Sequence, residues 1–305
     1  MGVLLVYMLL GRVLRPVERI ARLADSLGEH DLHRRVDVKA PDDELGELVR
    51  TFNRMLARLE SSFKTLRAFT ADASHELRSP LALMKTELEV VLTKPVSTTE
   101  YRRVLDSLQS EVQHMAGMVD RLLLLARAEA GELRPRHEDL DVADFVHDAY
   151  GRWLTRASQQ GVQLELSAPD SGSMQADLDL TRRVIDNLLD NALRHSPKDG
   201  VVRLTADRNI DRWRFEVADQ GPGIPEDERD RIFERFARAD SARTPDSEGG
   251  TGLGLTLSAA FARVQGGEVR LITRAGWGAV FEVSLPDRPG GQSERRDLAD
   301  GASNR

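Results

Sequence analysis

Hydrophobic residues recur every three or four positions through most of the chain up to about Ala130, which is the spacing of one buried stripe along an α-helix. Around the centre of this region the stripe consists of Phe69, Ala73, Leu77, Leu81, Met84 and Leu88. His75 is two residues from both Ala73 and Leu77, and at about 100° per residue this places it on the solvent side of the helix. Pro80 lies inside the same pattern. We expect it to bend or loosen the helix, because an interior proline removes a backbone hydrogen bond.

The His75 helix is predicted to end near Thr93, and a second helix follows a turn at Lys94-Pro95. Ser97 and Glu100 have the spacing of a capping box, which marks the start of this second helix. Its hydrophobic stripe consists of Tyr101, Val104, Leu108, Val112, Met115, Val119, Leu122 and Ala126. A hairpin of two such helices is too thin to bury both stripes, so we expect two copies to form a homodimeric four-helix bundle.

Before the His75 helix, residues 12–62 carry two shorter amphipathic helices joined by a connector. The second is predicted to start at Asp42-Asp43-Glu44, where acidic side chains suit the positive end of the helix dipole. Its stripe follows the alternating three-and-four spacing of a coiled coil and consists of Leu45, Leu48, Phe52, Met55 and Leu59. Two successive spacings of four lead on to Phe63, and such a stutter locally unwinds a coiled coil.

The apolar run at residues 3–10 rises about 12 Å as a helix, against about 30 Å for the hydrocarbon core of a bilayer. It also lacks the basic start and the cleavage site of a signal peptide. We expect residues 1–11 to be the end of a transmembrane helix that begins upstream in the natural chain, with Arg12 and Arg15 at the cytoplasmic face. The alternative is an N-terminal helix that packs on a soluble surface.

After residue 138 the pattern changes to short alternating strands separated by helices, which predicts an α/β domain. The predicted strands are residues 162–166, 201–205, 213–217, 269–272 and 279–284. The predicted helices are residues 140–160, 178–194, 226–237 and 253–265. Residues 288–305 are rich in Gly, Ser, Arg and Asp and are predicted to be a disordered tail.

The composition limits the chemistry. The chain has no cysteine, which excludes disulfides, thiolate zinc sites and thiol nucleophiles and fits a reducing cytoplasm. The net charge is −7 and the basic residues are scattered, so a nucleic-acid groove is not expected.

Two motifs of the α/β half carry polar groups suited to a nucleotide. Asn187 and Asn191 are one turn apart, so both amides face one side of a helix. They can bind magnesium and phosphate oxygens without adding negative charge. Asp219 follows a strand and precedes Gly221 and Gly223. Its carboxylate can accept a hydrogen bond from an exocyclic amine, and the glycines allow close approach of the backbone.

Two further motifs follow. Ile232-Phe233-Glu-Arg-Phe236 is the third, and the run from Gly249 to Leu255 is the fourth. The fourth leads into a helix, whose first backbone amides can cradle phosphates. The polar stretch at 237–248 between them is predicted to be a mobile lid. The spacing matches neither a Walker loop nor the Rossmann fingerprint.

In this order the four motifs resemble the N, G1, F and G2 boxes of the sensor histidine kinases. The string His75-Glu76-Leu-Arg-Ser79-Pro resembles the phosphoacceptor box of the same family. The resemblance implies a coiled coil and a dimeric four-helix bundle followed by an α/β two-layer sandwich, the GHKL fold shared with gyrase, Hsp90 and MutL ATPases. The implied domains are a HAMP-like linker at 12–62, a dimerisation and phosphoacceptor hairpin at 63–134, and an ATP-binding catalytic domain at 138–287.

The resemblance also implies the reaction. His75 would take the phosphoryl group of magnesium-ATP, with Glu76 taking the ring proton or fixing the tautomer, and would pass it to an aspartate in the receiver domain of a response regulator. Asn191 would hold Mg²⁺, Asn187 and Arg194 would approach the phosphates, His195 would lie near the adenine, and Asp219 would bond the adenine amine. The implied ATP-binding residues are Asn187, Asn191, Arg194, His195, Asp219, Gly221, Gly223, Gly250, Thr251, Gly252, Leu253, Gly254 and Leu255.

Three alternatives stay open at this point. Ser79 would orient a water that hydrolyses the phosphorylated regulator, although family members of this type often carry Thr or Asn there. A nucleotide-gated scaffold without histidine chemistry is the alternative function, and the intact His75-Glu76 pair argues against it. For Phe233 and Phe236, packing in the core is the alternative to control of the lid. The expected location is the cell membrane, with the catalytic part in the cytoplasm.

Overall fold

The computed structural model describes residues 20–22, 33–36, 44–93, 96–237 and 252–288. The apolar run at 1–11, most of the first linker helix, the expected lid from 238 on and the tail at 289–305 lie outside these residues. The chain divides into two compact units, Met1–Arg78 and Ser79–Arg305, and each is described by itself. Within the described residues, none of the helices has the length and apolar character needed to cross a bilayer.

Helix α2 (Glu44–Thr93) contains both the coiled-coil stripe and the His75 stripe, which the sequence predicted as separate elements. It ends at Thr93 as expected, and it is continuous through Pro80. The proline therefore does not end the helix, although it cannot donate the backbone hydrogen bond of an interior position.

In the first unit, an extended segment at residues 34–36 is fastened to α2. The side chain of Asn53 pairs with both backbone groups of Val36: its Oδ1 accepts from Val36 N at 3.0 Å and its Nδ2 donates to Val36 O at 3.2 Å. Arg35 Nη2 lies 2.6 Å from Glu60 Oε2. Hydrogen bonds from Lys64 and Arg35 lower the pKa of Glu60 to about 2. The connector is thus attached to the coiled-coil helix by polar bonds at Arg35 and at buried Val36.

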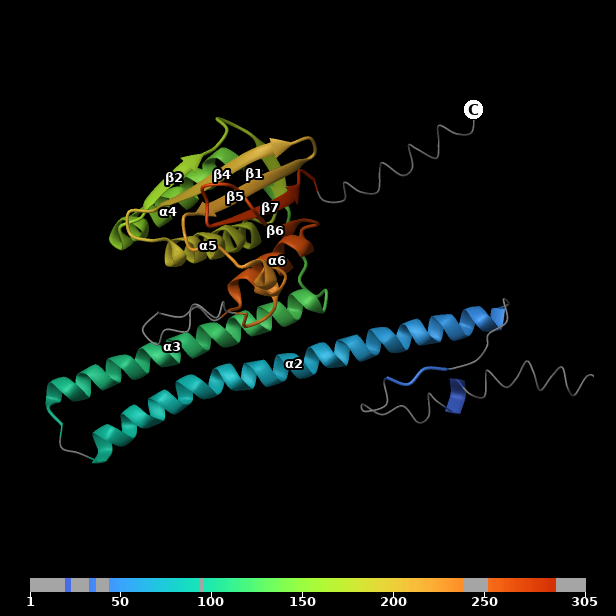
Figure 1. Cartoon of the computed structure of the whole chain (residues 1–305), viewed down its shortest axis with the longest axis horizontal. Helices are drawn as coiled ribbons and strands as arrows, with labels where there is room; N and C mark the ends of the chain where they lie inside the picture. Colours follow the sequence, from blue (N-terminus) through green and yellow to red (C-terminus); the bar gives the residue numbers. More distant parts are fainter. Residues whose placement is uncertain (1–19, 23–32, 37–43, 94–95, 238–251, 289–305) are drawn as a thin grey trace, which may run out of the picture. The chain divides into compact units, whose positions relative to one another are not determined.

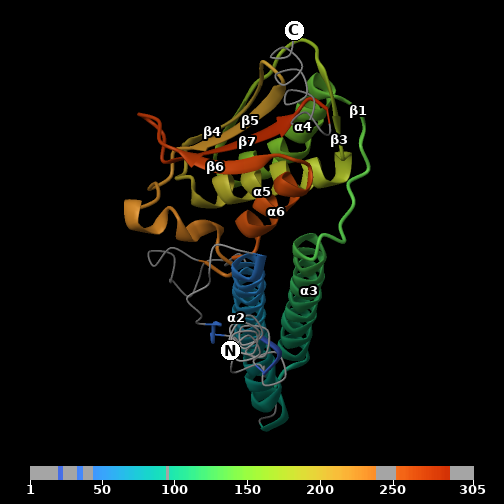
Figure 2. The same ribbon diagram turned by 90° about the vertical axis from the view of Figure 1, so that its right-hand side faces the viewer.

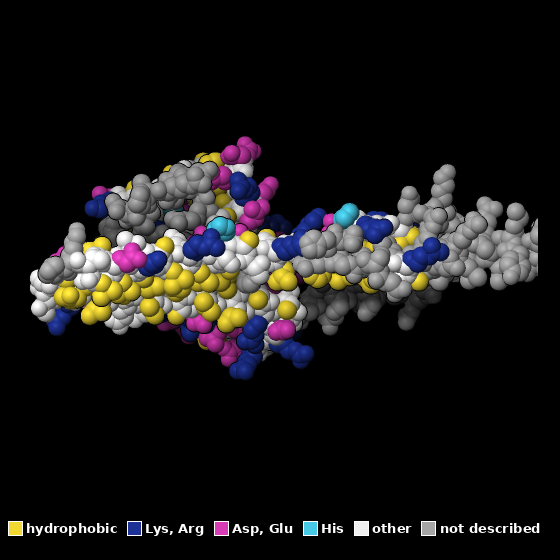
Figure 3. All heavy atoms as spheres, turned by 90° about the horizontal axis from the view of Figure 1, so that it is seen from below, with side chains coloured by type: hydrophobic (Ala, Val, Ile, Leu, Met, Phe, Trp, Pro, Cys, Tyr) yellow, Lys and Arg dark blue, Asp and Glu magenta, His cyan; other side chains and the backbone are white. Residues whose placement is uncertain are grey.

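Helix α3 (Thr98–Glu129) pairs with the end of α2 as a hairpin. Its first turn is capped by Ser97, whose Oγ accepts from Glu100 N at 3.2 Å, as the sequence predicted. Met118, Leu122 and Leu125 of α3 are buried, and α3 contacts helix α6 (Gly254–Val264) of the α/β half. Half of the predicted stripe of α3 is exposed to solvent, namely Tyr101, Val112, Val119 and Ala126, and Figure 3 shows a band of hydrophobic side chains along the helices. Exposed members of this band are Leu81, Leu88, Tyr101, Val112 and Val119.

The rest of the second unit is a two-layer α/β domain, as predicted. Its mixed sheet has five strands in the order β2 (Gln163–Ser167), β4 (Val201–Asn209), β5 (Arg212–Asp219), β7 (Ala279–Pro286) and β6 (Glu268–Ile272). Strands β2 and β4 are parallel, and the other neighbours are antiparallel. Helices α4 (Val142–Gln160), α5 (Leu178–His195) and α6 (Gly254–Val264) lie on one face of this sheet (Figures 1 and 2).

The core lies between the sheet and the helices. Strand β5 alternates, so Trp213, Phe215 and Val217 are buried against the helical layer. The ring of Phe145 on α4 meets that of Phe215 edge to face, with centroids 6.1 Å apart. Burial of each such side chain contributes about 1.5–3 kcal/mol, which makes this layer contact the main source of stability.

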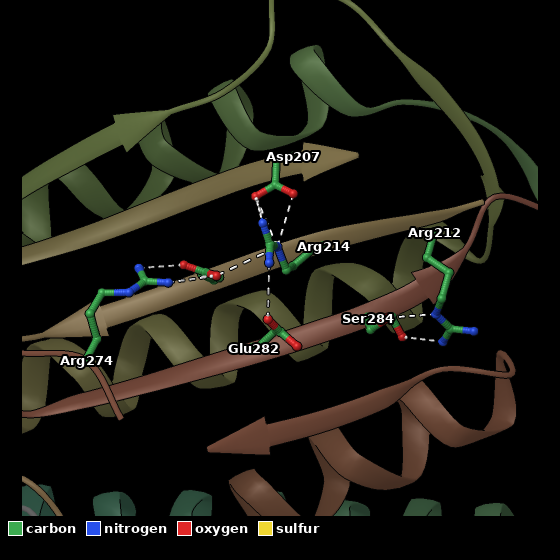
Figure 4. Close-up of polar contacts among 7 residues, drawn as sticks. Asp207, Arg212, Arg214, Arg274, Glu282 and Ser284 are labelled. Atoms are coloured by element: carbon green, nitrogen blue, oxygen red, sulfur yellow. Dashed lines mark hydrogen bonds and ion pairs between the residues drawn. The ribbon is translucent and has the colours of Figure 1, made fainter. Parts of the chain in front are cut away.

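The opposite face of the sheet carries paired charges (Figure 4). Arg214 donates to both carboxylate oxygens of Asp207 at 2.8–3.1 Å. Arg274 Nη1 lies 2.8 Å from Glu216 Oε2, and Glu216 is buried beneath the two arginines. The pKa values of both arginines are raised, chiefly by these hydrogen bonds. The open face is thereby kept polar without unpaired buried charge.

Two elements depart from the predictions. Strands β1 (Glu138–Asp141) and β3 (Ser173–Ala176) form a second, two-stranded sheet, so α4 starts at Val142 rather than at residue 140. The predicted helix at 226–237 was wrong: residues Glu226–Glu228 and Arg231–Phe233 are separate 3₁₀ turns. Phe236 has a positive φ of 57°, which a continuing helix does not allow.

Gly172 tests the packing of the core. A Cβ at this position would lie 2.5 Å from the ring of buried Trp213, so Gly172→Ala is expected to lower the free energy of unfolding by about 1–3 kcal/mol. Gly151, inside α4, has open space where a Cβ would lie, with no atom within 4 Å, so Gly151→Ala should instead raise it by about 0.5–1 kcal/mol. Urea unfolding of both variants measures the difference. Equal effects of the two substitutions would contradict the proposed contact.

Candidate functional site

The side chain of Asp219 is held in a fixed position in the candidate site. It is the last residue of β5 and is paired across the sheet with Val202 and Ala279. Its Oδ1 accepts hydrogen bonds from Gly221 N at 2.8 Å and Ala279 N at 3.2 Å, and the residue is only 2% exposed. Burial raises the pKa of the Asp219 carboxyl, although the two backbone N–H groups and His195 oppose this shift. The carboxylate is therefore held in one orientation by neutral donors.

The loop after Asp219 contains glycines at positions that do not favour a larger residue. A Cβ on Gly221 would lie 2.7 Å from the carbonyl oxygen of His195 at the end of α5. A Cβ on Gly278, just before β7, would lie 2.2 Å from the carbonyl oxygen of Gly221. Gly223 has a φ of +78°, which favours glycine. The sequence reasoning missed Gly278, although a glycine directly before a strand is a signal of close backbone approach.

His195 lies where this loop meets the end of α5. Its side chain is exposed, but the surrounding protein removes enough water from the ring to lower its pKa. Arg194 lowers the pKa further, whereas Asp219 and Asp190 act in the opposite direction. The ring is therefore mainly neutral near pH 7, which suits contact with a neutral aromatic ligand.

Asn187 connects α5 to the first turn of α6. Its Nδ2 donates to Gly254 O at 3.3 Å and to Ser258 Oγ at 3.4 Å. Leu253, the residue at the N-cap of α6, is buried and makes no side-chain cap hydrogen bond. The first backbone N–H groups of a helix have no partner within the helix, so this terminus can bind an anion. Sequence reasoning missed Ser258, which is fully buried beside these groups.

Asn191 and Arg194 follow on the same helix. Asn191 is half-buried one turn after Asn187. Arg194 Nη2 lies 2.7 Å from Asp190 Oδ2, so an ion pair on its own helix orients it. An amide oxygen combined with phosphate oxygens and water matches the all-oxygen shell that Mg²⁺ prefers, so Asn191 fits a metal-binding role.

The third motif is fastened to the start of α6. Phe236 N donates to Gly252 O at 3.1 Å, and Thr256 Oγ1 donates to Glu234 O at 3.0 Å. Gly252 has a φ of +65°, and a Cβ there would lie 2.6 Å from Phe236 Cα. Phe233 packs edge to face on buried Phe281, with centroids 6.3 Å apart, which supports its core-packing alternative.

Of the remaining predicted nucleotide residues, Leu255 is half-buried in the first turn of α6. Gly250 and Thr251 lie outside the described residues.

The predicted phosphoacceptor residues are on α2. His75 is exposed, Glu76 beside it is half-buried, and exposed Ser79 follows one turn later. His75 and Glu76 belong to the first unit, whereas the nucleotide residues belong to the second. The structure thus groups Asp219, His195 and the glycines at one place and Asn187 with α6 at another, all within one unit.

Three family profiles match the chain. They are the HAMP domain at residues 8–61, the His Kinase A (phospho-acceptor) domain at 65–131, and the Histidine kinase-, DNA gyrase B-, and HSP90-like ATPase at 176–289. Sensor protein CutS of Streptomyces coelicolor is 35% identical over 281 residues, which cover 92% of this chain and 67% of CutS. The signal transduction histidine-protein kinase BaeS of Escherichia coli is 32% identical over 286 residues, which cover 94% of this chain and 60% of BaeS.

Solved structures show the same fold. Histidine kinase AdeS of Acinetobacter baumannii aligns with a TM-score of 0.57 and 22% identity over 70% of this chain and 98% of that chain. Histidine kinase ThkA, in a complex with response regulator protein TrrA, aligns with a TM-score of 0.61 and 19% identity over 81% of this chain and 69% of that chain.

The raised pKa of Asp219 predicts a pH-dependent stability. The folded state favours the protonated carboxyl, so its stabilisation is complete below the ordinary pKa of 3.8 and is lost as the pH rises through the higher folded value. Asp219→Asn keeps an oxygen that can accept both backbone bonds and carries no charge. Without nucleotide, its melting temperature should exceed that of the wild type by a margin that grows from about pH 4 to pH 7. Thermal unfolding across that range measures the difference in melting temperature. A difference that stays constant or shrinks with rising pH would show that ionisation of Asp219 does not destabilise the folded protein.

Proposed function

This chain belongs to the sensor histidine kinases of two-component systems, and we propose that His75 is the residue that it phosphorylates. Members of the family phosphorylate themselves on histidine from ATP and pass the phosphoryl group to a response regulator. The observation that carries the proposal is an exposed histidine beside a half-buried glutamate on α2, inside the stretch that matches the phospho-acceptor domain. A nucleotide-gated scaffold would not need this pair.

In the proposed reaction, the lone pair of one His75 ring nitrogen attacks the γ-phosphorus of ATP. The bond from that phosphorus to the bridging oxygen breaks, and ADP leaves with the electron pair. Glu76 takes the proton of the ring or holds the tautomer that leaves the attacking nitrogen unprotonated. An aspartate carboxylate of the regulator then attacks the same phosphorus, and His75 is regenerated.

The geometry of the second unit supports one orientation of the bound nucleotide, with the purine near Asp219 and the phosphates near the start of α6. Asp219 and His195 form the end for a neutral purine, where the fixed carboxylate accepts from the adenine amine. Asn187, Arg194 and the amides at the start of α6 form the end for the phosphates. Mg²⁺ held by Asn191 would neutralise charge on the phosphates.

We propose two partners for this chain, a second copy of itself and a response regulator. The hydrophobic band of the hairpin is exposed in a single chain, which supports a homodimer through a four-helix bundle. The receiver domain of a response regulator is the proposed acceptor. We assign the linker to residues 12–62, the hairpin to 63–134 and the catalytic domain to 138–287, with attachment to the membrane through the N-terminal side.

His75→Gln tests the phosphoacceptor. We expect it to abolish phosphorylation of the chain and to leave ATP affinity unchanged, because it is not among the nucleotide-binding residues. Incubation with γ-labelled ATP, followed by acid treatment, measures the acid-labile label of a phosphohistidine. His114→Gln, at an exposed position on α3, is the matched control and should label normally. Wild-type labelling of His75→Gln would refute the assignment.

The position of Ser79 supports a second activity, hydrolysis of the phosphorylated regulator. It is exposed one turn after His75 on the same helix, so its hydroxyl can be directed at a docked partner from the same side. Pro80 follows it directly and frees a backbone carbonyl in this turn. A hydroxyl here can orient water, whereas Glu76 serves the kinase step.

We expect Ser79→Ala to keep most autophosphorylation and to lose most hydrolysis of the regulator phosphate, while Ser79→Thr should keep or raise hydrolysis. The assay follows phosphate loss from the purified cognate phospho-regulator with each variant, magnesium and ADP, beside an autophosphorylation assay. If Ala reduces both activities together, or neither, Ser79 has no separate hydrolytic role.

A further inference from the structure

Helices α4 and α5 are joined by two ion pairs one turn apart. Arg152 Nη2 lies 3.1 Å from Asp186 Oδ1, and Arg156 Nη2 lies 2.6 Å from Asp190 Oδ1. Both pairs connect the same two helices and differ by four positions along each. They therefore offer an internal comparison, since any general effect of an α4 arginine on stability should be similar for both.

Of these two ion pairs, only Arg156–Asp190 includes a carboxylate that also binds Arg194, a residue predicted to contact the nucleotide. Asp190 accepts from Arg156 with Oδ1 and from Arg194 with Oδ2, the latter at 2.7 Å. The side chains of Asp190 and Arg194 are 30% and 29% exposed, so both stay near the surface. One carboxylate thus binds an arginine of α4 on one side and an arginine of the phosphate end on the other.

Arg156 is itself held in place. Its guanidinium lies over the ring of Trp153, 5.1 Å from the centroid. Trp153 Nε1 in turn donates to Asp186 Oδ1 at 2.7 Å, which fixes the ring against α5. A guanidinium stacked on a fixed ring loses little freedom when it binds a carboxylate.

We propose that Arg156 is a positioning residue for ATP: by sharing the carboxylate of Asp190, it weakens the hold of Asp190 on Arg194 and so lets Arg194 turn to the phosphates. The inference rests on the proposed function, in which Arg194 approaches the triphosphate. Arg194 must give up part of its bond to Asp190 when a phosphate oxygen becomes its acceptor. A carboxylate already neutralised by Arg156 is a weaker competitor for that guanidinium than one without it.

Arg152 shares no carboxylate with Arg194 in the described contacts. It binds Asp186 and, on its own helix, Asp148. Asp186 is in turn bonded to Trp153 rather than to Arg194. Arg152→Gln removes the same charge from the same surface, one turn away, and serves as the matched control.

The test is the initial rate of autophosphorylation of the full chain, measured across concentrations of magnesium-ATP so that KM and the limiting rate kcat are obtained separately, with melting temperature measured beside them. Arg156→Gln is expected to raise the KM for ATP about three- to fivefold with little change in kcat, as one partly exposed ion pair allows. Arg156→Lys should recover part of the effect, and Arg152→Gln should leave KM unchanged. Asp190→Asn should lower KM, because Arg194 no longer competes with a carboxylate.

The double variant of Arg156→Gln with Asp190→Asn distinguishes an effect through the Arg156–Asp190 contact from an effect of losing positive charge in general. If Arg156 acts through Asp190, adding Arg156→Gln to Asp190→Asn changes KM no further. A rise of KM by the same factor in that background, or an equal rise with Arg152→Gln, would overturn the inference.

Arg194→Gln separates this inference from the proposed function. A raised KM with Arg194→Gln but not with Arg156→Gln overturns the positioning role and leaves the proposed function intact. An unchanged KM with Arg194→Gln removes Arg194 from the phosphate end and overturns both the inference and that assignment. Absence of any label on the wild-type chain would instead overturn the kinase function itself.

Discussion

The close approach of three backbone segments at Asp219 is the constraint on which the rest of the site depends. The end of β5, the segment before β7 and the end of α5 meet within distances that exclude a Cβ at Gly221 and Gly278. Gly278 N also donates to Asp219 O at 2.7 Å, so the main chain as well as the side chain is held. Burying a carboxyl costs free energy. Here hydrogen bonds from backbone groups that cannot move independently of the sheet offset that cost. A binding group placed this way needs no ordering when a ligand arrives.

The sequence predicted the parts of the fold that have strong periodicity. Helix α5 and four strands of the main sheet match their predicted ranges within two residues at each end, because alternating or helical burial is visible in the residues themselves, whereas β4 continues to Asn209 beyond its predicted end at residue 205. The four-residue strands β1 and β3 bury too little to leave such a pattern. The stretch at 226–237 reads as helical in composition, yet its backbone is set by tertiary bonds such as that from Thr256 to Glu234 O.

The same limit applies to the site. Motif order predicted Asn187 and Asp219 as site residues, because the spacing of the motifs along the chain is specific in combination. No pattern placed Arg156 beside Asp190, since the pair joins two ordinary surface residues from two separate helices, α4 and α5. Contacts of this kind depend on the angle between α4 and α5, which packing decides and local sequence does not.

The two carboxylates of this region would present different chemistry to the two ends of the proposed nucleotide. Asp219 is buried and bonded to neutral backbone donors, so it keeps its acceptor character toward a neutral amine. Asp190 lies near the surface between two guanidinium groups, so its charge is offset by Arg156 and by Arg194, the cation proposed to approach phosphate. If their surroundings were exchanged, a cation-paired carboxylate would be a poorer acceptor for adenine, and an unpaired one would repel the triphosphate. The local environments, more than the residue types, therefore favour one direction of binding.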